Sequence, residues 1–224
     1  MNNTIANGVV SGAPSDVIDV LQFALLLEHL EAEYYTRGTK MGGPVPQSDL
    51  PVFNTIRNHE NAHVAALIQV IQSKGGTPAP KPNFDFTAKG AVPDPFGAGN
   101  YQIFLALAQA FEDTGVRAYK GQAGRLMSDT QVLSAALSIH SVEARHASMV
   151  RYLRGQKGWI TGDDRGGLPA FAQPIYDGEA NVTQAGVNLS ALGNGNGGIG
   201  AVTEAFDEPL TKEQVTAIVT PFLA

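Results

Sequence analysis

Residues 57–63, RNHENAH, place Glu60 and His63 three positions apart in a segment that we predict to be a long helix. Because an α-helix has about 3.6 residues per turn, both side chains leave the same face. A carboxylate and an imidazole side by side can hold one divalent metal ion. The same pair returns in residues 140–146, HSVEARH, as Glu143 and His146. A single Glu-x-x-His occurs often by chance, so the residues that accompany both copies decide its meaning.

Each copy of this motif follows a carboxylate and a tyrosine at a matched spacing. Glu28 precedes Tyr35 by seven residues, and Glu112 precedes Tyr119 by seven residues. The step from the first carboxylate to the glutamate of the motif is 32 residues in one copy and 31 in the other. Matched spacing of this kind indicates a duplicated helix pair, with a long connection joining the two copies.

The apolar pattern and the helix-breaking residues predict an all-α fold. An irregular arm is expected over residues 1–14, before the first helix. Four long helices follow, at about 15–37, 51–74, 100–121 and 128–154. They are long enough, and apolar enough, to form a four-helix bundle.

Polar residues and glycine mark the expected ends of several helices. Ser15 is the expected N-cap of the first helix, and Gly38 ends it. Ser128 begins a Ser-x-x-Gln capping box for the fourth helix. Thr211 begins the same type of pattern and predicts a short fifth helix over 211–219.

The connecting segments have compositions of their own. Residues 75–98 contain five prolines and predict a long extended crossover between the second and third helices. Residues 17–27 and 103–111 are apolar on nearly every side, so something outside the bundle must cover them. Residues 155–210 are rich in Gly and Asn, and we expect an ordered wrap over those faces, with a flexible tail as the alternative.

Two such hairpins packed antiparallel bring four glutamates and two histidines to the bundle centre. These residues are Glu28, Glu60, His63, Glu112, Glu143 and His146. Four carboxylates carry four negative charges, which two divalent ions neutralise, whereas neutral imidazoles add no charge. Without those ions, the buried like charges would be costly and would have to take up protons. Oxygen and nitrogen ligands suit iron or manganese, so we predict two divalent metal ions, Mn or Fe.

This constellation resembles the ferritin-like superfamily of di-iron and di-manganese carboxylate proteins, over about residues 15–155. The resemblance implies a ferritin-like four-helix bundle with one long crossover between helices 2 and 3. It also implies one histidine on each metal, Glu28 and Glu112 as terminal ligands, and Glu60 and Glu143 as bridging ligands.

Two stretches narrow the resemblance. Residues 27–38, LEHLEAEYYTRG, and 205–215, AFDEPLTKEQV, look like the desiccation-related ferritin-like group of bacteria and plants. That group is similar in arrangement to the manganese catalases. In those catalases the carboxylate of the last Glu-x-x-His can lie outside the direct metal ligands and accept a proton. The resemblance therefore implies a catalytic role for Glu143 and leaves open whether it binds a metal directly.

Several residues near the motifs keep a second interpretation. Glu31 lies one turn beyond Glu28 and is the alternative ligand, although the matched spacing favours Glu28. Tyr35 and Tyr119 either hydrogen-bond ligand carboxylates from the next layer or serve as ordinary core aromatics. Three unmatched histidines are expected at the surface or just outside the ligands: His29, His59 and His140. Three acids are expected to be solvated: Asp113, Asp163 and Asp164. We expect Arg57 and Arg145 to form ordinary surface pairs, with neutralisation of nearby carboxylates as the alternative.

Composition bounds the possible partners. The 224 residues fit a bundle domain over 1–155 and an extension over 156–224 packed on it. A net charge of −6 argues against a nucleic-acid partner, and no apolar run reaches the roughly 20 residues that would span a membrane. Charged residues make up 16%, below the roughly 25% of ordinary domains, which indicates much buried surface, an oligomer interface or an exported protein. Among these we expect a homo-oligomer. The chain has no cysteine, hence no Cys-x-x-Cys electron-transfer element.

The first residues, MNNTIANGVV, lack the basic start and long apolar core of a signal peptide. We therefore expect a cytoplasmic protein, with an exported form that has lost its signal as the alternative. The leading functional hypothesis is a dimetal oxidoreductase that removes hydrogen peroxide. The alternatives are an iron-oxidising or metal-storing protein that uses dioxygen, and a non-enzymatic metal-binding desiccation protectant. The Gly-rich segment before the last helix argues against a storage cage.

Overall fold

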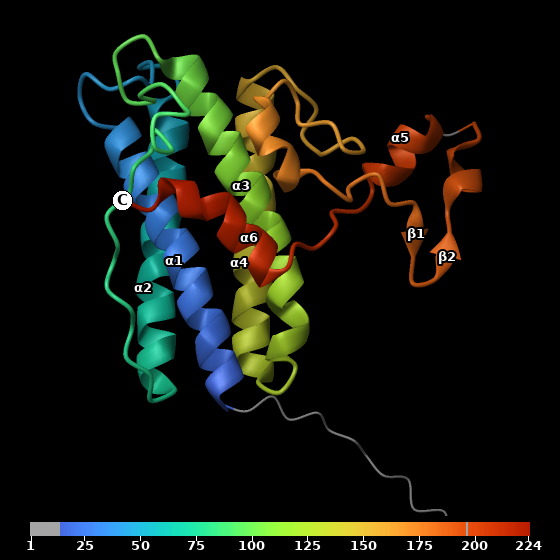
Figure 1. The fold of residues 1–224 in the computed structure, drawn as a ribbon, viewed down its shortest axis with the longest axis horizontal. Helices are drawn as coiled ribbons and strands as arrows, with labels where there is room; N and C mark the ends of the chain where they lie inside the picture. The colour runs from blue at the N-terminus through green and yellow to red at the C-terminus, as the bar shows by residue number, and fades with distance from the viewer. Residues whose placement is uncertain (1–13, 196) are drawn as a thin grey trace, which may run out of the picture.

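Four long antiparallel helices form the body of the protein (Figure 1). A computed structural model describes residues 14–195 and 197–224. The helices are α1 (Pro14–Gly38), α2 (Leu50–Ser73), α3 (Tyr101–Ala123) and α4 (Thr130–Leu153). Helix α1 packs mainly on α2, and α3 packs mainly on α4, so the two predicted hairpins are present. The all-α bundle predicted from the sequence is confirmed.

Two of the expected helix caps are wrong. Helix α1 begins at Pro14, so Ser15 lies inside its first turn, where a preceding proline is well suited to start a helix. Helix α4 is capped by Asp129 and not by Ser128, because the Asp129 carboxylate accepts the backbone N–H of Val132. The arm expected over residues 1–14 lies almost wholly outside the described residues.

Two hydrophobic clusters divide the bundle along its length. The first contains Tyr34, Phe53 and Phe104, together with side chains of the crossover. The second contains Leu25, Leu67 and other residues nearer the start of α1. On each of the four helices the predicted metal ligands lie between residues of the two clusters. The site is thus held in a polar layer between two apolar layers.

Residues 76–85 of the crossover are extended, as its prolines predict, and run along the outside of the α1–α2 hairpin (Figure 1). Residues 86–91 instead form turns, so the predicted extended crossover is confirmed only in its first part. Phe84 and Phe86 turn inward and join the first hydrophobic cluster. The end of the chain pairs with this segment, because the backbone N–H of Asp85 donates to Phe222 O at 2.8 Å. The crossover therefore closes one end of the bundle together with the last residues of the chain.

The C-terminal extension covers the outer faces of α1 and α3 in two stretches. One contains the 3₁₀ helix η2 (Ala170–Ile175), which packs on Ala110 of α3 with Ile160 and Tyr176. The other contains α6 (Lys212–Val219) and η4 (Thr220–Phe222), and α6 packs on Phe23 of α1 and on α3 (Figure 1). Helix α6 begins with the predicted capping box of Thr211 and Gln214. These stretches give the cover that the apolar runs require.

One buried arginine fastens this extension to the bundle. Arg117 on α3 donates from Nε to Glu208 O at 2.7 Å and from Nη2 to Asp177 O at 3.0 Å. Its guanidinium also donates to Ile175 O and forms an ion pair with Glu179 at 2.7 Å. A single side chain of α3 therefore holds four residues of the extension.

Asp113 corrects a further expectation. It is buried and not solvated, since its carboxylate accepts from Arg151 of α4 at 2.6 and 3.0 Å. The hydroxyl of Tyr176 donates to the same carboxylate at 2.7 Å. Asp113 points outward from the bundle, where the extension covers it, so only the tertiary structure buries it. Asp163 and Asp164 are exposed, as predicted.

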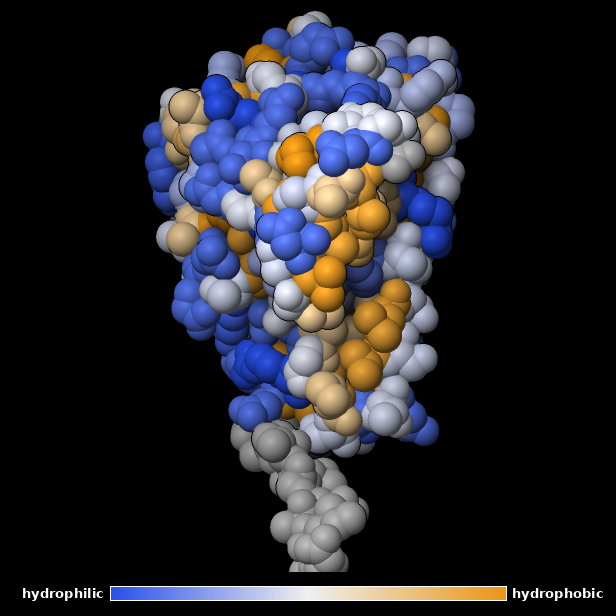
Figure 2. All heavy atoms as spheres, turned by 90° about the vertical axis from the view of Figure 1, so that its right-hand side faces the viewer, coloured by the Kyte–Doolittle hydropathy of each residue, from blue (hydrophilic) through white to orange (hydrophobic). Residues whose placement is uncertain are grey.

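One part of the extension does not lie on the bundle. It contains the hairpin of β1 (Thr183–Gln184) and β2 (Val187–Asn188), the 3₁₀ helix η3 (Ser190–Gly193) and the short helix α5 (Gly198–Thr203). These elements project sideways in Figure 1, and Figure 2 looks onto that side, where apolar side chains gather. Exposed Val187, Leu192 and Ile199 belong to this part. The expected wrap is therefore incomplete, since this glycine-rich stretch supplies few side chains that can pack on the bundle.

None of the helices in the described part of the chain combines the length and the apolar character that crossing a bilayer requires.

The 3₁₀ helix η1 (Gly124–Leu126) connects α3 to α4.

A glycine on α3 permits the close approach of the extension, and its replacement tests this contact. A Cβ at Gly121 would collide with the backbone oxygen of Leu210. We expect Gly121→Ala to lower the free energy of unfolding by about 1–3 kcal/mol, as overpacking does, measured by thermal denaturation. Gly124→Ala is the matched control, because nothing lies near its Cβ position and its φ of −61° suits alanine. Equal melting temperatures of the two variants would contradict the tight contact.

Candidate metal centre

The six predicted ligands converge at the middle of the bundle, each from the helix expected for it. Helix α1 supplies Glu28, α3 supplies Glu112, and α2 and α4 each supply one Glu-x-x-His pair. The four glutamates are fully buried. Such burial of four carboxylates is rare, because charged groups are left inside proteins only when something pairs with them.

Their ligand atoms form two overlapping groups. One group joins Glu28, Glu60, His63 and Glu143, with one ligand atom from each within 4.8 Å of the others. The second group has the same compactness and replaces the α1 residue and the first histidine with Glu112 and His146. Glu60 and Glu143 belong to both groups, which is the arrangement expected of bridging carboxylates.

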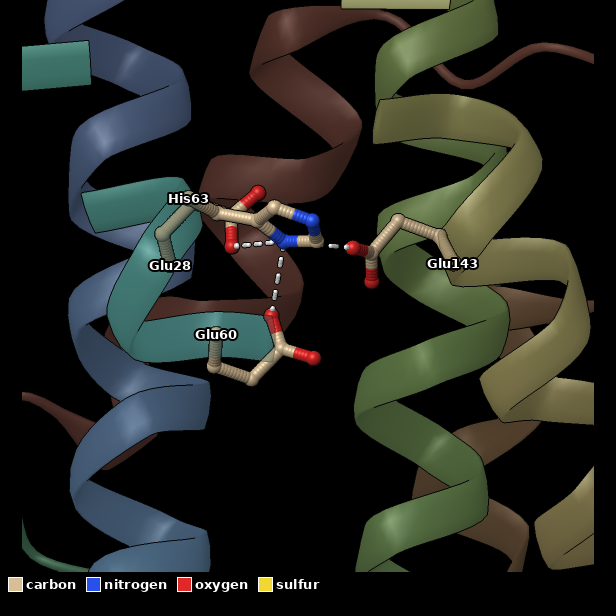
Figure 3. Close-up of side chains that lie close together, drawn as sticks. All are labelled: Glu28, Glu60, His63 and Glu143. Atoms are coloured by element: carbon tan, nitrogen blue, oxygen red, sulfur yellow. Dashed lines mark hydrogen bonds and ion pairs between the residues drawn. The ribbon is translucent and has the colours of Figure 1, made fainter. Parts of the chain in front are cut away.

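His63 shows how tightly the first group is drawn together. Its Nδ1 atom lies 3.1 Å from Glu28 Oε2, 3.1 Å from Glu60 Oε2 and 3.2 Å from Glu143 Oε1 (Figure 3). One imidazole nitrogen has one site for a hydrogen or a metal ion. Three carboxylates from three helices thus point at a single nitrogen, which is the pattern that a shared cation would satisfy.

The second group is built around His146 in the same way. Its Nδ1 atom lies 2.8 Å from Glu60 Oε1 and 3.4 Å from Glu112 Oε2. The opposite ring nitrogen, Nε2, lies 3.0 Å from Nδ1 of His59, and the two rings stack. His59 is exposed and was left open between surface residue and outer neighbour of a ligand. It does contact a predicted ligand.

Two tyrosines cross from one half of the repeat to the other. The hydroxyl of Tyr35 donates to Glu112, and the hydroxyl of Tyr119 donates to Glu28. Both tyrosines are buried, and burial raises the pKa of each hydroxyl well above its usual value. Each hydroxyl therefore keeps its proton and orients the carboxylate of the other hairpin.

A fifth carboxylate, Glu31, also enters this layer. It is buried, but it belongs to neither of the two ligand groups, whereas Glu28 belongs to the first. A Cβ placed at Gly115 would lie 3.3 Å from Glu31 Oε1 and 3.3 Å from Glu143 Oε2. Gly115 stands three residues after Glu112, as Glu31 stands three after Glu28. The glycine thus leaves room for the extra carboxylate of the other copy.

The donor set fits a pair of cations. Several ligand atoms are buried without any hydrogen-bond partner: Glu60 Oε1, Glu112 Oε2, both oxygens of Glu143, and His146 Nδ1. Some of these atoms approach one another as ion pairs, but without the geometry of a hydrogen bond. Unsatisfied buried acceptors that point at common positions need positive charge, which two divalent ions would supply.

The two histidines must carry protons when no ion is bound. Burial alone would lower the pKa of His63, but the close carboxylates of Glu143, Glu28 and Glu60 raise it to about 12. Burial also opposes the protonation of His146, but the close carboxylates of Glu112 and Glu60 raise its pKa to about 11. Both imidazoles are therefore charged near neutral pH in the metal-free protein.

The carboxylates divide by their neighbours. Burial, reinforced by the charge of Glu60, raises the pKa of Glu28 to about 8, although its hydrogen bond with His63 opposes the rise. Burial and nearby carboxylates raise the pKa values of Glu31 and Glu143 well above the usual range. Glu60 is the exception, because its contacts with His146 and His63 outweigh burial and lower its pKa to about 2. In the absence of metal ions, protons on the carboxyl groups and on the two histidines thus offset the negative charge of the site.

The other sequence candidates lie outside the two ligand groups. His29 is nearly buried and His140 is partly buried, with no hydrogen-bond partner on its Nδ1. Arg57 donates to Thr39 Oγ1 at 2.9 Å, and Arg145 is exposed. Neither arginine forms an ion pair within the described residues, so the surface pairing expected for them is absent there.

Sequence reasoning missed two features of the site. It treated Glu31 only as a rival of Glu28, whereas the structure buries both. It also gave His59 no particular partner. The sequence contained a signal in each case. When the two copies of the repeat are aligned, Gly115 occupies the position equivalent to Glu31, and Val142 occupies the position equivalent to His59. Positions where a repeat breaks inside a ligand layer are candidates for function.

Comparison with known proteins agrees with this geometry. A family model described as a ferritin-like domain matches residues 16–156. A search among curated proteins found no match.

Metal binding should release protons, because metal ions need the atoms that protons occupy. At neutral pH we expect Mn²⁺ binding to release more than one proton, chiefly from His63 and His146, whose pKa values are raised. Raised pKa values mean that protons compete with the metal, so affinity should rise with pH. Calorimetry in buffers of different ionisation enthalpy measures this release. Binding without proton release would contradict the protonation described above.

His59 should support metal binding through His146. When Nδ1 of His146 binds an ion, its proton sits on Nε2, which can donate to His59. We expect His59→Phe to weaken metal affinity about 10–100-fold, measured by competition with a coloured chelator. His59→Gln, which keeps an acceptor, should lose less, and Asn58→Ala at the exposed neighbouring position should lose nothing. Equal affinities of the Phe and Gln variants would show that the hydrogen bond is unimportant.

Proposed function

The chain belongs to the ferritin-like domain family, and from this premise we propose that it is a dimetal carboxylate oxidoreductase that disproportionates hydrogen peroxide. The observation that carries the proposal is the pair of overlapping ligand groups that share Glu60 and Glu143. Glu60 and Glu143 would help to hold both ions, so the two ions would be close enough to act together on one small molecule.

Manganese or iron fits the donor set best. The site offers oxygen and imidazole nitrogen and, with no cysteine in the chain, no sulfur. When bound, a pair of such ions supplies the two electrons that cleavage of a peroxide bond requires. Because this chain has no Cys-x-x-Cys electron-transfer element, a reaction that needs no outside electrons is favoured. The preference for manganese rests on the resemblance to the manganese catalases.

The surrounding residues would hold the centre and move protons. Tyr35 and Tyr119 orient the carboxylates of Glu112 and Glu28. In the arrangement in which Glu143 lies just outside the direct ligands, it is the proposed proton-handling group, because it is buried beside the centre and both of its oxygens lack a hydrogen-bond donor. It can therefore hold a proton taken from the substrate and return it to a leaving oxygen.

We further propose that the protein belongs to the desiccation-related group of this family. Two stretches support this assignment. Residues 27–38 contain Glu28, Glu31 and Tyr35 of the centre, and residues 205–215 contain the segment that docks on Arg117 and caps α6. Both stretches therefore have structural roles, so members of one group of relatives would be expected to share their sequences. A homo-oligomer is also proposed, supported by the exposed apolar residues of the projecting part.

Oxygen release tests the activity. We expect protein loaded with two Mn²⁺ ions to release dioxygen from hydrogen peroxide, followed with an oxygen electrode. His63→Ala should abolish the reaction, because it removes the nitrogen on which three carboxylates converge. His140→Ala is the matched control, because this histidine lies on α4 outside the ligand groups.

Two other outcomes would replace the proposal. Protein with two ions bound and no turnover would contradict a catalase, and oxidation of ferrous iron by dioxygen would then favour the iron-oxidising alternative. If the metal only raises the melting temperature while no substrate is consumed, the centre serves stability alone.

A further inference from the structure

An apolar cavity lies directly beside the ligand layer. Its volume is about 50 Å³, and residues of all four long helices line it. Ala24, Leu67 and Ile139 each stand four residues from a predicted ligand of their own helix, on the side toward the start of α1. Four residues of helix rise about 6 Å, so the cavity occupies the next layer of the bundle.

The lining offers almost nothing to a polar molecule. Two of the described lining residues, Tyr119 and Gln122, carry a polar side-chain atom. The hydroxyl of Tyr119 donates to Glu28, and the side-chain oxygen of Gln122 accepts from Arg125. The volume exceeds the roughly 10–15 Å³ that one water needs, but a buried water also needs two to four polar partners. A cavity of this kind stays dry and accepts small apolar molecules.

The cavity lies between the centre and the surface. Tyr119 lines it and also contacts Glu28, so one side chain separates the cavity from the ligand layer. On the opposite side, Ala66 of α2 and Ala135 of α4 line it and are exposed. Small side chains on the two helices leave a mouth between them, while the buried Leu126 lines the interior.

We propose that this cavity binds dioxygen, as a holding site for a small apolar molecule one layer from the metal centre. Dioxygen is the product of peroxide disproportionation and the oxidant of ferrous iron, so its relevance rests on the proposed function. The binding of dioxygen does not depend on the proposed function, because the lining of the cavity contains none of the predicted metal ligands. Hydrogen peroxide, which needs hydrogen-bond partners, is excluded from this site by the same lining.

Xenon tests the cavity, because it is apolar and can be located directly. We expect crystals of the full chain under xenon pressure to show one bound atom among Leu67, Leu126 and Ile139. Ala136→Leu, which fills the lining from α4, should lose that atom. Ala144→Leu is the matched control, a partly buried alanine of the same helix that is not part of the lining, and it should keep the atom. Ala66→Leu, which fills the mouth from α2, replaces Ala136→Leu if that variant does not fold.

Dissolved dioxygen tests the occupant itself. It is paramagnetic, so it speeds the relaxation of nearby methyl groups in metal-free protein under oxygen pressure. Leu126 lines the cavity and Leu105 is equally buried but distant from it, so relaxation should increase more at Leu126. Equal effects, or xenon absent from the wild-type cavity, would overturn the inference. These measurements need no metal, so their failure is distinct from failure of the proposed activity.

Discussion

The structure depends on one electrostatic constraint: five carboxylates are buried in a single layer of a helical bundle. Glu28, Glu31, Glu60, Glu112 and Glu143 cannot all stay ionised there without nearby positive charge. In the metal-free protein, protonated His63 and His146 supply positive charge, and protons on several carboxyl groups remove negative charge. With two divalent ions the same layer would become nearly neutral, and the unsatisfied oxygens would gain partners. The apolar clusters on either side keep water out and so maintain this constraint.

The centre is nearly, but not fully, symmetric, and the unmatched residues lie beside one of its two Glu-x-x-His pairs. The two halves of the repeat supply matching ligands and exchange tyrosine hydrogen bonds. Two positions break the match, since Glu31 faces Gly115 and His59 corresponds to Val142. Glu31 approaches Glu143 and His59 contacts His146, so both additions fall on the second Glu-x-x-His pair. The second ligand group therefore differs from the first in the contact of its histidine, His146, with the surface residue His59.

The C-terminal extension matters because α1 and α3 are apolar on more faces than a four-helix bundle can bury. Residues of η2 and α6 cover those faces, and Arg117 ties the extension to α3 through backbone oxygens. Arg151 and Asp113 connect the same region to α4. Asp113 and Arg117 follow Glu112 closely on α3, so the extension helps to hold the helix that presents this ligand.

The sequence alone determined the four helices, the crossover, the fifth-helix cap and the six converging residues. These follow from periodicity, proline content and matched spacing, which are local properties of a chain. Tertiary structure decided the rest: the burial of Asp113 and Glu31, the contact of His59 with His146, the crossed tyrosine bonds and the apolar cavity. Each depends on which helix faces meet and on what covers them. Asp113 illustrates the reason. Its position next to Glu112 shows that it points away from the ligands, whereas only the packed structure shows that Arg151 and Tyr176 donate to its carboxylate.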